Sequence, residues 1–231
     1  MDHEQRLGTI TGPIVLRDEY GLHNLGASVW SGPGNAVSVA RHDARFILLV
    51  EKQTVFARLR EDEFATKSRC VLVCGNGVPG TAFHPLLRRL HDQLQVPFYV
   101  LADNDPAGYE LFFVTTRGAA RGRGAARAEC AIPAAAYLGL RAVDYQLLGL
   151  GDRVQIELTG RERDRVRRLK AYPWLESDTA WQRELDALLQ RGFKVEIEAL
   201  CSISTSCLAE EYLPERLSAS DHLRLSAAGR T

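Results

Sequence analysis

The sequence has no apolar run approaching the ~18 residues that a membrane-spanning helix needs. It begins Met1-Asp2-His3-Glu4, without the basic and then apolar residues of a secretory signal. Both absences argue against a membrane or secreted protein. We therefore expect a cytoplasmic protein with no membrane partner.

Zinc-binding patterns and an excess of charge of one sign are also lacking. The five cysteines include no CxxC pair and no histidine partner at zinc spacing, so buried free thiols are the simpler interpretation. The 29 basic and 29 acidic residues cancel, so no global field indicates a nucleic-acid partner. Charge is instead segregated: residues 117–127 carry four arginines and no acid. Glycines keep this segment mobile, and it could wrap a phosphate backbone or be a plain exposed connection.

Apolar runs that alternate with helical patterns dominate the first two thirds of the chain. Runs at 46–50, 70–74 and 98–102 are separated by helical spacing in 53–61 and 83–94. This alternation predicts βαβ units and an α/β fold, with a doubly wound, Rossmann-like parallel sheet flanked by helices.

The regions on either side of this core have different patterns. Residues 1–45 lack helical periodicity and predict a β-rich connecting segment. A short strand is expected near 137–140, followed by a charged helix at 161–170, an apolar helical stripe from Trp181 that Gly192 ends, and a further helix from about Val195. We therefore divide the chain into a connecting segment (1–45), an α/β domain (46–160), a helical extension packed on it (161–217) and a frayed tail (218–231).

Acidic residues follow two of the predicted strands. Glu51 comes directly after the run at 46–50, and Asp103 and Asp105 follow the run at 98–102. If these strands are parallel neighbours, their ends share one sheet edge, and the three carboxylates meet there. Three close carboxylates repel unless a cation compensates them, and hard oxygen ligands suit Mg²⁺. An open Mg²⁺ site at a strand edge in turn suggests phosphodiester chemistry.

Two other interpretations of these residues remain open. Glu51 could pair with Lys52 or a nearby arginine, while Asp103 and Asp105 merely shape an Asp-x-Asp-Pro turn. Alternatively, residues 75–80 satisfy GxGxxG and could bind a dinucleotide. Pro79 removes one amide that could hold a pyrophosphate, and the dinucleotide interpretation leaves Glu51 and Asp105 unexplained.

An ordered set of short motifs resembles one family of proteins. The motifs are Val50-Glu51-Lys52, Gly77-x-Pro79, Asp103-x-Asp105-Pro106-x-Gly108, Leu138-Gly139-Leu140 before Asp144, Leu158-Thr159 and Gly192-x-Lys194-x-Glu196. From about Gly8 to Leu217 the chain is similar to the Toprim region that the topoisomerase VI A subunit shares with its relative, the meiotic double-strand-break protein. The resemblance implies a Toprim fold for residues 46–160.

The resemblance also implies a metal, partners and site residues. In that family the acids that match Glu51, Asp103 and Asp105 bind Mg²⁺, and DNA is cleaved by a tyrosine on a preceding winged-helix domain. That domain is not recognisable here, and neither Tyr20 nor Tyr109 lies in a matching motif. The family forms dimers and acts with a GHKL-type ATPase B subunit. By this resemblance the chain is the Toprim part of a type IIB topoisomerase, located at the nucleoid or, in a eukaryote, in the nucleus.

Four basic residues are the candidate contacts to double-stranded DNA: Lys52, Arg117, Arg121 and Arg123. Two other functions stay open. The chain could be a stand-alone nuclease that uses metal-activated water, which leaves free rather than protein-linked DNA ends. It could also be a noncatalytic DNA-binding or assembly module, in which case the Glu51→Ala and Asp103→Ala variants would keep its biological effect.

Overall fold

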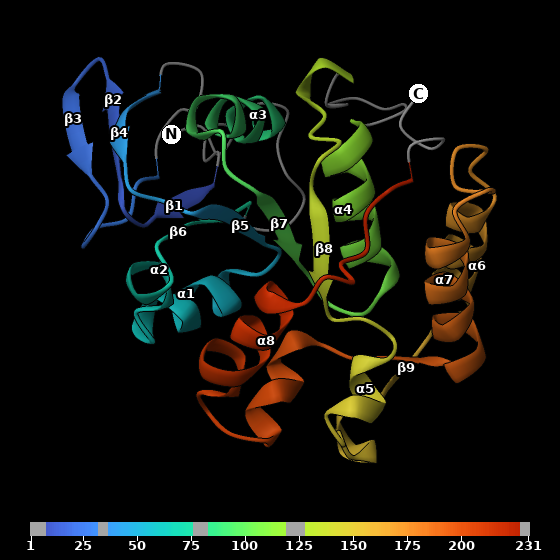
Figure 1. Cartoon of the computed structure of the whole chain (residues 1–231). Helices are drawn as coiled ribbons and strands as arrows, with labels where there is room; N and C mark the ends of the chain where they lie inside the picture. Colours follow the sequence, from blue (N-terminus) through green and yellow to red (C-terminus); the bar gives the residue numbers. More distant parts are fainter. Residues whose placement is uncertain (1–7, 32–36, 76–82, 119–127, 227–231) are drawn as a thin grey trace, which may run out of the picture. The chain divides into compact units, whose positions relative to one another are not determined.

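The computed structural model describes residues 8–31, 37–75, 83–118 and 128–226. Within these ranges the chain forms two compact units, which we describe separately (Figure 1). The first comprises residues up to 100 together with 114–135, and the second comprises 101–113 together with 136 onward. No helix in the described ranges has both the length and the apolar character needed to cross a membrane.

The first unit contains a sheet with the strand order β1-β6-β5-β7. Its strands are β1 (Thr9–Thr11), β5 (Phe46–Val50), β6 (Cys70–Cys74) and β7 (Phe98–Leu101). β5 and β6 pair in parallel and are buried along their whole length, as expected for central strands covered on both faces. β1 pairs antiparallel with β6, so the predicted connecting segment contributes an edge strand to the core sheet.

Helices lie on both sides of this sheet (Figure 1). They are α1 (Gln53–Glu61), α2 (Phe64–Lys67) and α3 (Phe83–Leu94). β6 and β7 lie on opposite sides of β5, so right-handed crossovers place α1 and α3 on opposite faces. The predicted doubly wound α/β fold is therefore confirmed. A separate antiparallel sheet is formed by β2 (Ile14–Asp18), β3 (Gly21–Asn24) and β4 (Ser38–His42).

The second unit begins at Leu101, the last residue of β7, and includes β8 (Ala136–Gly139). The Ala102 N–H donates to Gly139 O over 2.8 Å, and the Leu140 N–H donates to Ala102 O. Its regular elements are α4 (Pro106–Arg117, which runs on into the first unit), α5 (Asp144–Leu147), α6 (Gly160–Lys170), α7 (Thr179–Arg191), α8 (Leu213–Ser218), and the short strands β9 (Ile156–Glu157) and β10 (Phe193–Lys194).

The predicted end of α7 is confirmed, because Gly192 caps the helix with a φ of 78°, a conformation that favours glycine. Two local expectations need correction, and one element was not expected. The helix expected from Val195 starts at Ile197 as a 3-10 helix (Ile197–Ser202), because Val195 pairs with Asn104 as an isolated β-bridge. A π-helical turn (Leu208–Tyr212) precedes α8. Cys201 is exposed and Cys130 half-buried, so the expected burial of the thiols holds for only part of the set.

The C-terminal segment is not frayed as far as the structure describes it. Leu223 and Leu225 are buried, and Leu223 forms a β-bridge with Tyr137 of β8. The Ser226 N–H donates to Asp178 at the start of α7 over 2.8 Å. Two leucines spaced by one residue give this segment the one-sided burial of a short strand, a signal too short for periodicity to detect. Residues 227–231 lie outside the described ranges.

Candidate functional site

The turn Asp103-Asn104-Asp105 joins β7 to α4 and lies wholly in the second unit. Asp103 is only 3% exposed, and its Oδ1 accepts a hydrogen bond from the Ile197 N–H over 2.9 Å. Asp105 Oδ1 accepts from the Gly108 N–H over 2.8 Å, so Asp105 caps the helix that Pro106 opens. Both carboxylates are thus oriented by backbone amides.

Gly108 allows the first turn of α4 to lie against this turn. A Cβ atom built on Gly108 would come within 2.4 Å of Asp103 O and 3.0 Å of the Ala102 Cβ. Because backbone atoms cannot move aside cheaply, only glycine fits at this position without displacing the Asp103 peptide. The Asp-Pro-x-Gly spacing therefore has a steric reason in this structure.

A buried polar group that we call the Asn104 cluster holds the middle of the turn; it consists of Asn104, Tyr109, Glu184 and Arg191. The Asn104 Nδ2 donates to Tyr109 Oη and to Leu140 O, the latter over 3.2 Å, and Arg191 donates to Asn104 Oδ1. Glu184 Oε1 accepts from Tyr109 Oη at 2.8 Å. Burial raises the pKa of Glu184 and of Tyr109. Asn104 is therefore fixed between the two aspartates.

Lys194 of β10 is a second cation beside this turn, near Asp105. Its Nζ lies 3.9 Å from Asp105 Oδ2 and 2.7 Å from Glu162 Oε1. Hydrogen bonding to Glu162 raises the pKa of Lys194. Burial opposes ionisation of Glu162, but hydrogen bonds from Lys194 and Thr159 outweigh it and lower the pKa of Glu162 to about 2. The ion pair therefore stays charged over the physiological pH range.

Sequence reasoning missed the Asn104 cluster and did not give Lys194 a role. Asn104 contacts Glu184 and Arg191 across 80 and 87 residues of sequence. No local pattern encodes contacts at such separations. Lys194 could have been found, because it stands inside the Gly192-x-Lys194 motif two residues beyond a helix-ending glycine.

Glu51 and Lys52 lie in the first unit, directly after β5. Both are half-buried, Lys52 is the N-cap residue of α1, and Glu51 O accepts from the Cys74 thiol over 3.7 Å. Arg117, the last residue of α4, is half-buried, and burial lowers its pKa. Arg121 and Arg123 lie outside the described residues, as does the GxGxxG segment beyond Gly75.

The donor set suits a hard divalent cation, because Glu51, Asp103 and Asp105 offer carboxylate oxygens alone. Asp105 Oδ2 takes no part in the helix cap and faces Lys194 instead. Across the residues that the structure describes, no three His, Cys, Asp or Glu side chains are grouped as a metal site. The two aspartates share one turn in the second unit, and Glu51 belongs to the first. The three-carboxylate site thus stays a prediction.

Comparison with known proteins decides the family. Residues 46–217 match the Toprim domain of the topoisomerase 6 A-subunit/Spo11 family. The chain belongs to the topoisomerase 6 A-subunit/Spo11 family. The Toprim fold expected from the sequence motifs is therefore confirmed, and the dinucleotide-binding interpretation loses its support.

Several curated members of the topoisomerase 6 A-subunit/Spo11 family are similar to the chain over most of its length. Meiotic recombination protein SPO11-1 of Oryza sativa subsp. indica is 34% identical over 181 residues, which is 78% of this chain and 47% of that protein. Human meiotic recombination protein SPO11 is 31% identical over 91% of this chain and 54% of its own length. The A subunit of type 2 DNA topoisomerase 6 from Aeropyrum pernix is 31% identical over 78% of this chain and 48% of its own. The chain thus spans about half the length of these family members.

Proposed function

We propose that the chain is the Mg²⁺-binding Toprim part of a type IIB topoisomerase A subunit that takes part in DNA double-strand cleavage. The observation that carries this proposal is the Asp103-Asn104-Asp105 turn. It follows a strand adjacent to β5, and both of its carboxylates are oriented by backbone amides. Family membership supports the same role. The proposal places Glu51, at the end of β5, beside the two aspartates.

The proposal gives each candidate residue of the chain a role. Glu51, Asp103 and Asp105 hold Mg²⁺, which supplies positive charge to polarise or anchor a backbone phosphate. Lys194 sits beside Asp105 and limits the negative charge of the turn. Lys52, Arg117, Arg121 and Arg123 contact phosphates of double-stranded DNA, which positions the duplex without reading its sequence.

The remaining parts of the reaction come from other domains or chains. A winged-helix domain supplies the attacking tyrosine, while a second copy of the chain's own protein forms the dimer and a GHKL-type ATPase B subunit completes the assembly. The proposal places the protein with DNA, at the nucleoid or in a nucleus. Tyr109 cannot replace the missing tyrosine, because it is fully buried and donates its hydroxyl proton to Glu184.

Incubation of the purified chain with a short DNA duplex and Mg²⁺ tests this division of roles. We expect weak, salt-sensitive binding, no DNA covalently linked to protein, and no cleavage. Protein-linked DNA ends would contradict the proposal. Free cleaved ends that disappear in the Asp103→Asn variant would establish the nuclease alternative instead.

DNA affinity at several salt concentrations tests two of the four basic residues, Lys52 and Arg117. Each phosphate contact adds roughly 0.9 to the slope of log affinity against log salt. We therefore expect Lys52→Gln and Arg117→Gln each to lower the slope by about that amount. Arg153→Gln, a variant of an exposed residue elsewhere in the chain, is the control and should keep the slope. Unchanged slopes in the first two variants would remove these residues from the DNA surface.

A further inference from the structure

A cavity of about 700 Å³ in the second unit is lined by three arginines, and we call it the arginine cavity. Arg141 comes from the loop after β8, and Arg183 and Arg191 come from α7. Gln146 and Gln190 add amide groups to the wall, and Glu184 is its acid. The volume lies within the range of about 300 to 1,000 Å³ that is typical of small-molecule sites.

In the described part of the chain, the hydrogen-bond partners of the Arg191 guanidinium are all neutral. The guanidinium donates to Ala142 O over 2.9 Å, to Phe193 O over 3.2 Å and to Asn104 Oδ1, and it lies over the Phe193 ring. Among the described residues, no carboxylate lies within ion-pair distance of Arg191 or of Arg183. Burial lowers the pKa of Arg191.

Arg141 adds a donor without an acceptor. Its Nη1 pairs with Asp221 Oδ2 over 2.8 Å, at a carboxylate that is 62% exposed. Its Nε is buried and finds no acceptor among the groups that the structure describes. A buried N–H group without a partner is unfavourable, so an acceptor that reached this donor would be favoured.

Two acids lie near these three cations: Asp221, which pairs with Arg141 over 2.8 Å, and Glu184. The Glu184 Oε1 already accepts hydrogen bonds from the Tyr109 hydroxyl at 2.8 Å and from the Ala142 N–H at 2.6 Å. Burial raises the pKa of Glu184. The cavity wall therefore carries more positive than negative charge, which favours an anion.

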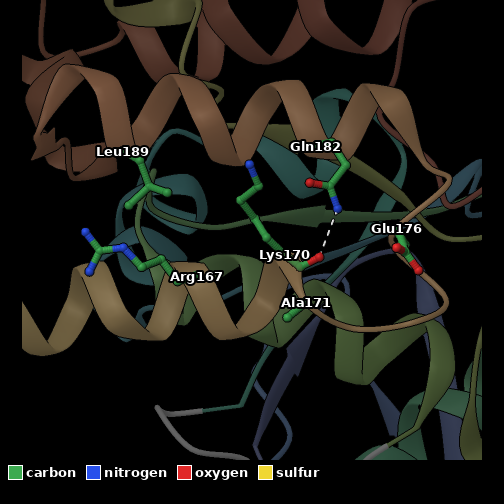
Figure 2. A pocket seen from close by; sticks show the side chains of 6 residues that line it. All are labelled: Arg167, Lys170, Ala171, Glu176, Gln182 and Leu189. Carbon is green, nitrogen blue, oxygen red and sulfur yellow. Dashed lines mark hydrogen bonds between the residues drawn. The ribbon is translucent and has the colours of Figure 1, made fainter.

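In a second hollow, between α6 and α7, acids balance the positive charges of the wall (Figure 2). Its two cations are paired: Arg167 with Asp164 over 2.7 Å, and Lys170 with Asp186. Glu176 adds a further negative charge to the wall. Unlike the arginine cavity, this hollow has no surplus of cations, and its Arg167 provides a matched control.

We propose that the arginine cavity binds a phosphate group, either of a free nucleotide or of a nucleic-acid backbone. Guanidinium groups donate paired N–H bonds that match phosphate oxygens. Arg141 and the two cations of α7 line this cavity from different elements, as recognition of a multivalent anion requires. This proposal does not depend on Mg²⁺ or on the proposed DNA cleavage.

Titration of the full chain with pyrophosphate, and separately with a short DNA duplex, tests the proposal. A chelator in the buffer removes divalent cations, so failure of the Mg²⁺ site cannot affect the result. We expect Arg183→Gln, at an exposed position, to weaken binding roughly five-fold, as loss of one partly solvated charge contact does. The Arg167→Gln control should bind as the wild type does.

The two titrations distinguish the sources of phosphate. Weaker pyrophosphate binding by Arg183→Gln assigns the cavity to a free nucleotide or its diphosphate, and weaker binding of DNA alone assigns it to a backbone phosphate. Equal affinities of Arg183→Gln and the wild type in both titrations would overturn the proposal, as would no binding in either. A nuclear magnetic resonance titration tests directly whether the ligand binds in the arginine cavity. The signal of the Arg141 Nε–H group should shift on titration, and an unchanged signal would contradict the proposal.

Discussion

Contacts within the protein itself hold the residues of the Asp103-Asn104-Asp105 turn in position. Asp103 accepts from a backbone amide of the segment after β10, Asp105 caps α4, and Asn104 is held by the Asn104 cluster. Preorganisation of this kind reduces the entropy lost when a ligand binds. Single substitutions at Gly108 and Glu162, which lie beside the turn, can therefore probe how it is held.

The Gly108→Ala variant should displace the turn, because its methyl group would approach Asp103 O to 2.4 Å. Overpacking of this kind lowers the free energy of unfolding by about 1 to 3 kcal/mol. Urea denaturation followed by circular dichroism measures the change. Gly151→Ala is the control, because a Cβ there meets nothing within 4 Å. Equal unfolding midpoints for the two variants would show that the steric account of Gly108 is wrong.

Glu162 should stabilise the protein in a pH-dependent way. Its pKa is about 2 in the folded protein against an ordinary 4.5, so its contribution is full above pH 4.5 and is lost as the pH falls toward 2. We expect Glu162→Gln to lower the free energy of unfolding by about 1 kcal/mol near neutral pH, with a smaller difference in acid.

Urea midpoints of the wild type and Glu162→Gln at a series of pH values measure this dependence. Glu176→Gln, a variant at an exposed position, should change stability little at any pH. A stability difference that stays constant across the acid range would mean that Glu162 does not act through its ionised form.

At the level of secondary structure, α4 and α7 support the site through aromatic packing. Trp181 of α7 is fully buried, stacks on Phe112 with ring centroids 5.0 Å apart, and meets Phe113 edge-on at 4.7 Å. This packing fixes α7, which carries Glu184 and Arg191 of the Asn104 cluster. A change that loosens the packing of α4 against α7 should therefore also disturb the Asp103-Asn104-Asp105 turn.

Trp181→Ala should lower the free energy of unfolding by about 3 to 5 kcal/mol, because it leaves a large cavity in the core. Tyr172→Ala is the control: that ring is 37% exposed, and its removal should cost about 1 kcal/mol or less. Chemical denaturation of both variants is the measurement. Similar losses in the two would contradict a central packing role for Trp181.

The elements that could be predicted from sequence are those with a strong local pattern. β5, α1, β6 and α3 have the bounds that the apolar runs and helical spacing indicate, because each element buries a whole face on its own. The bridge between Asn104 and Val195 and the packing of Leu223 depend on partners far along the chain, so they were missed. The same reason explains why the sequence could suggest the carboxylates of the candidate site but not the Asn104 cluster.

At the level of the whole molecule, the chain corresponds to only part of the length of its relatives. Its match to the Toprim domain extends over residues 46–217, and it spans about half the length of relatives such as human SPO11. The proposed metal site draws Glu51 from the first unit and two aspartates from the second. Cation binding should therefore stabilise the folded chain against heat.

Calorimetric titration of the full chain with Mg²⁺ tests the central claim most directly. We expect saturable binding by the wild type, weakened roughly ten-fold or more in both Glu51→Gln and Asp103→Asn, because each variant loses a charged ligand. Glu176→Gln should bind Mg²⁺ as the wild type does. Absence of Mg²⁺ binding by the wild type, or wild-type affinity in Glu51→Gln, would contradict a shared site of the three carboxylates.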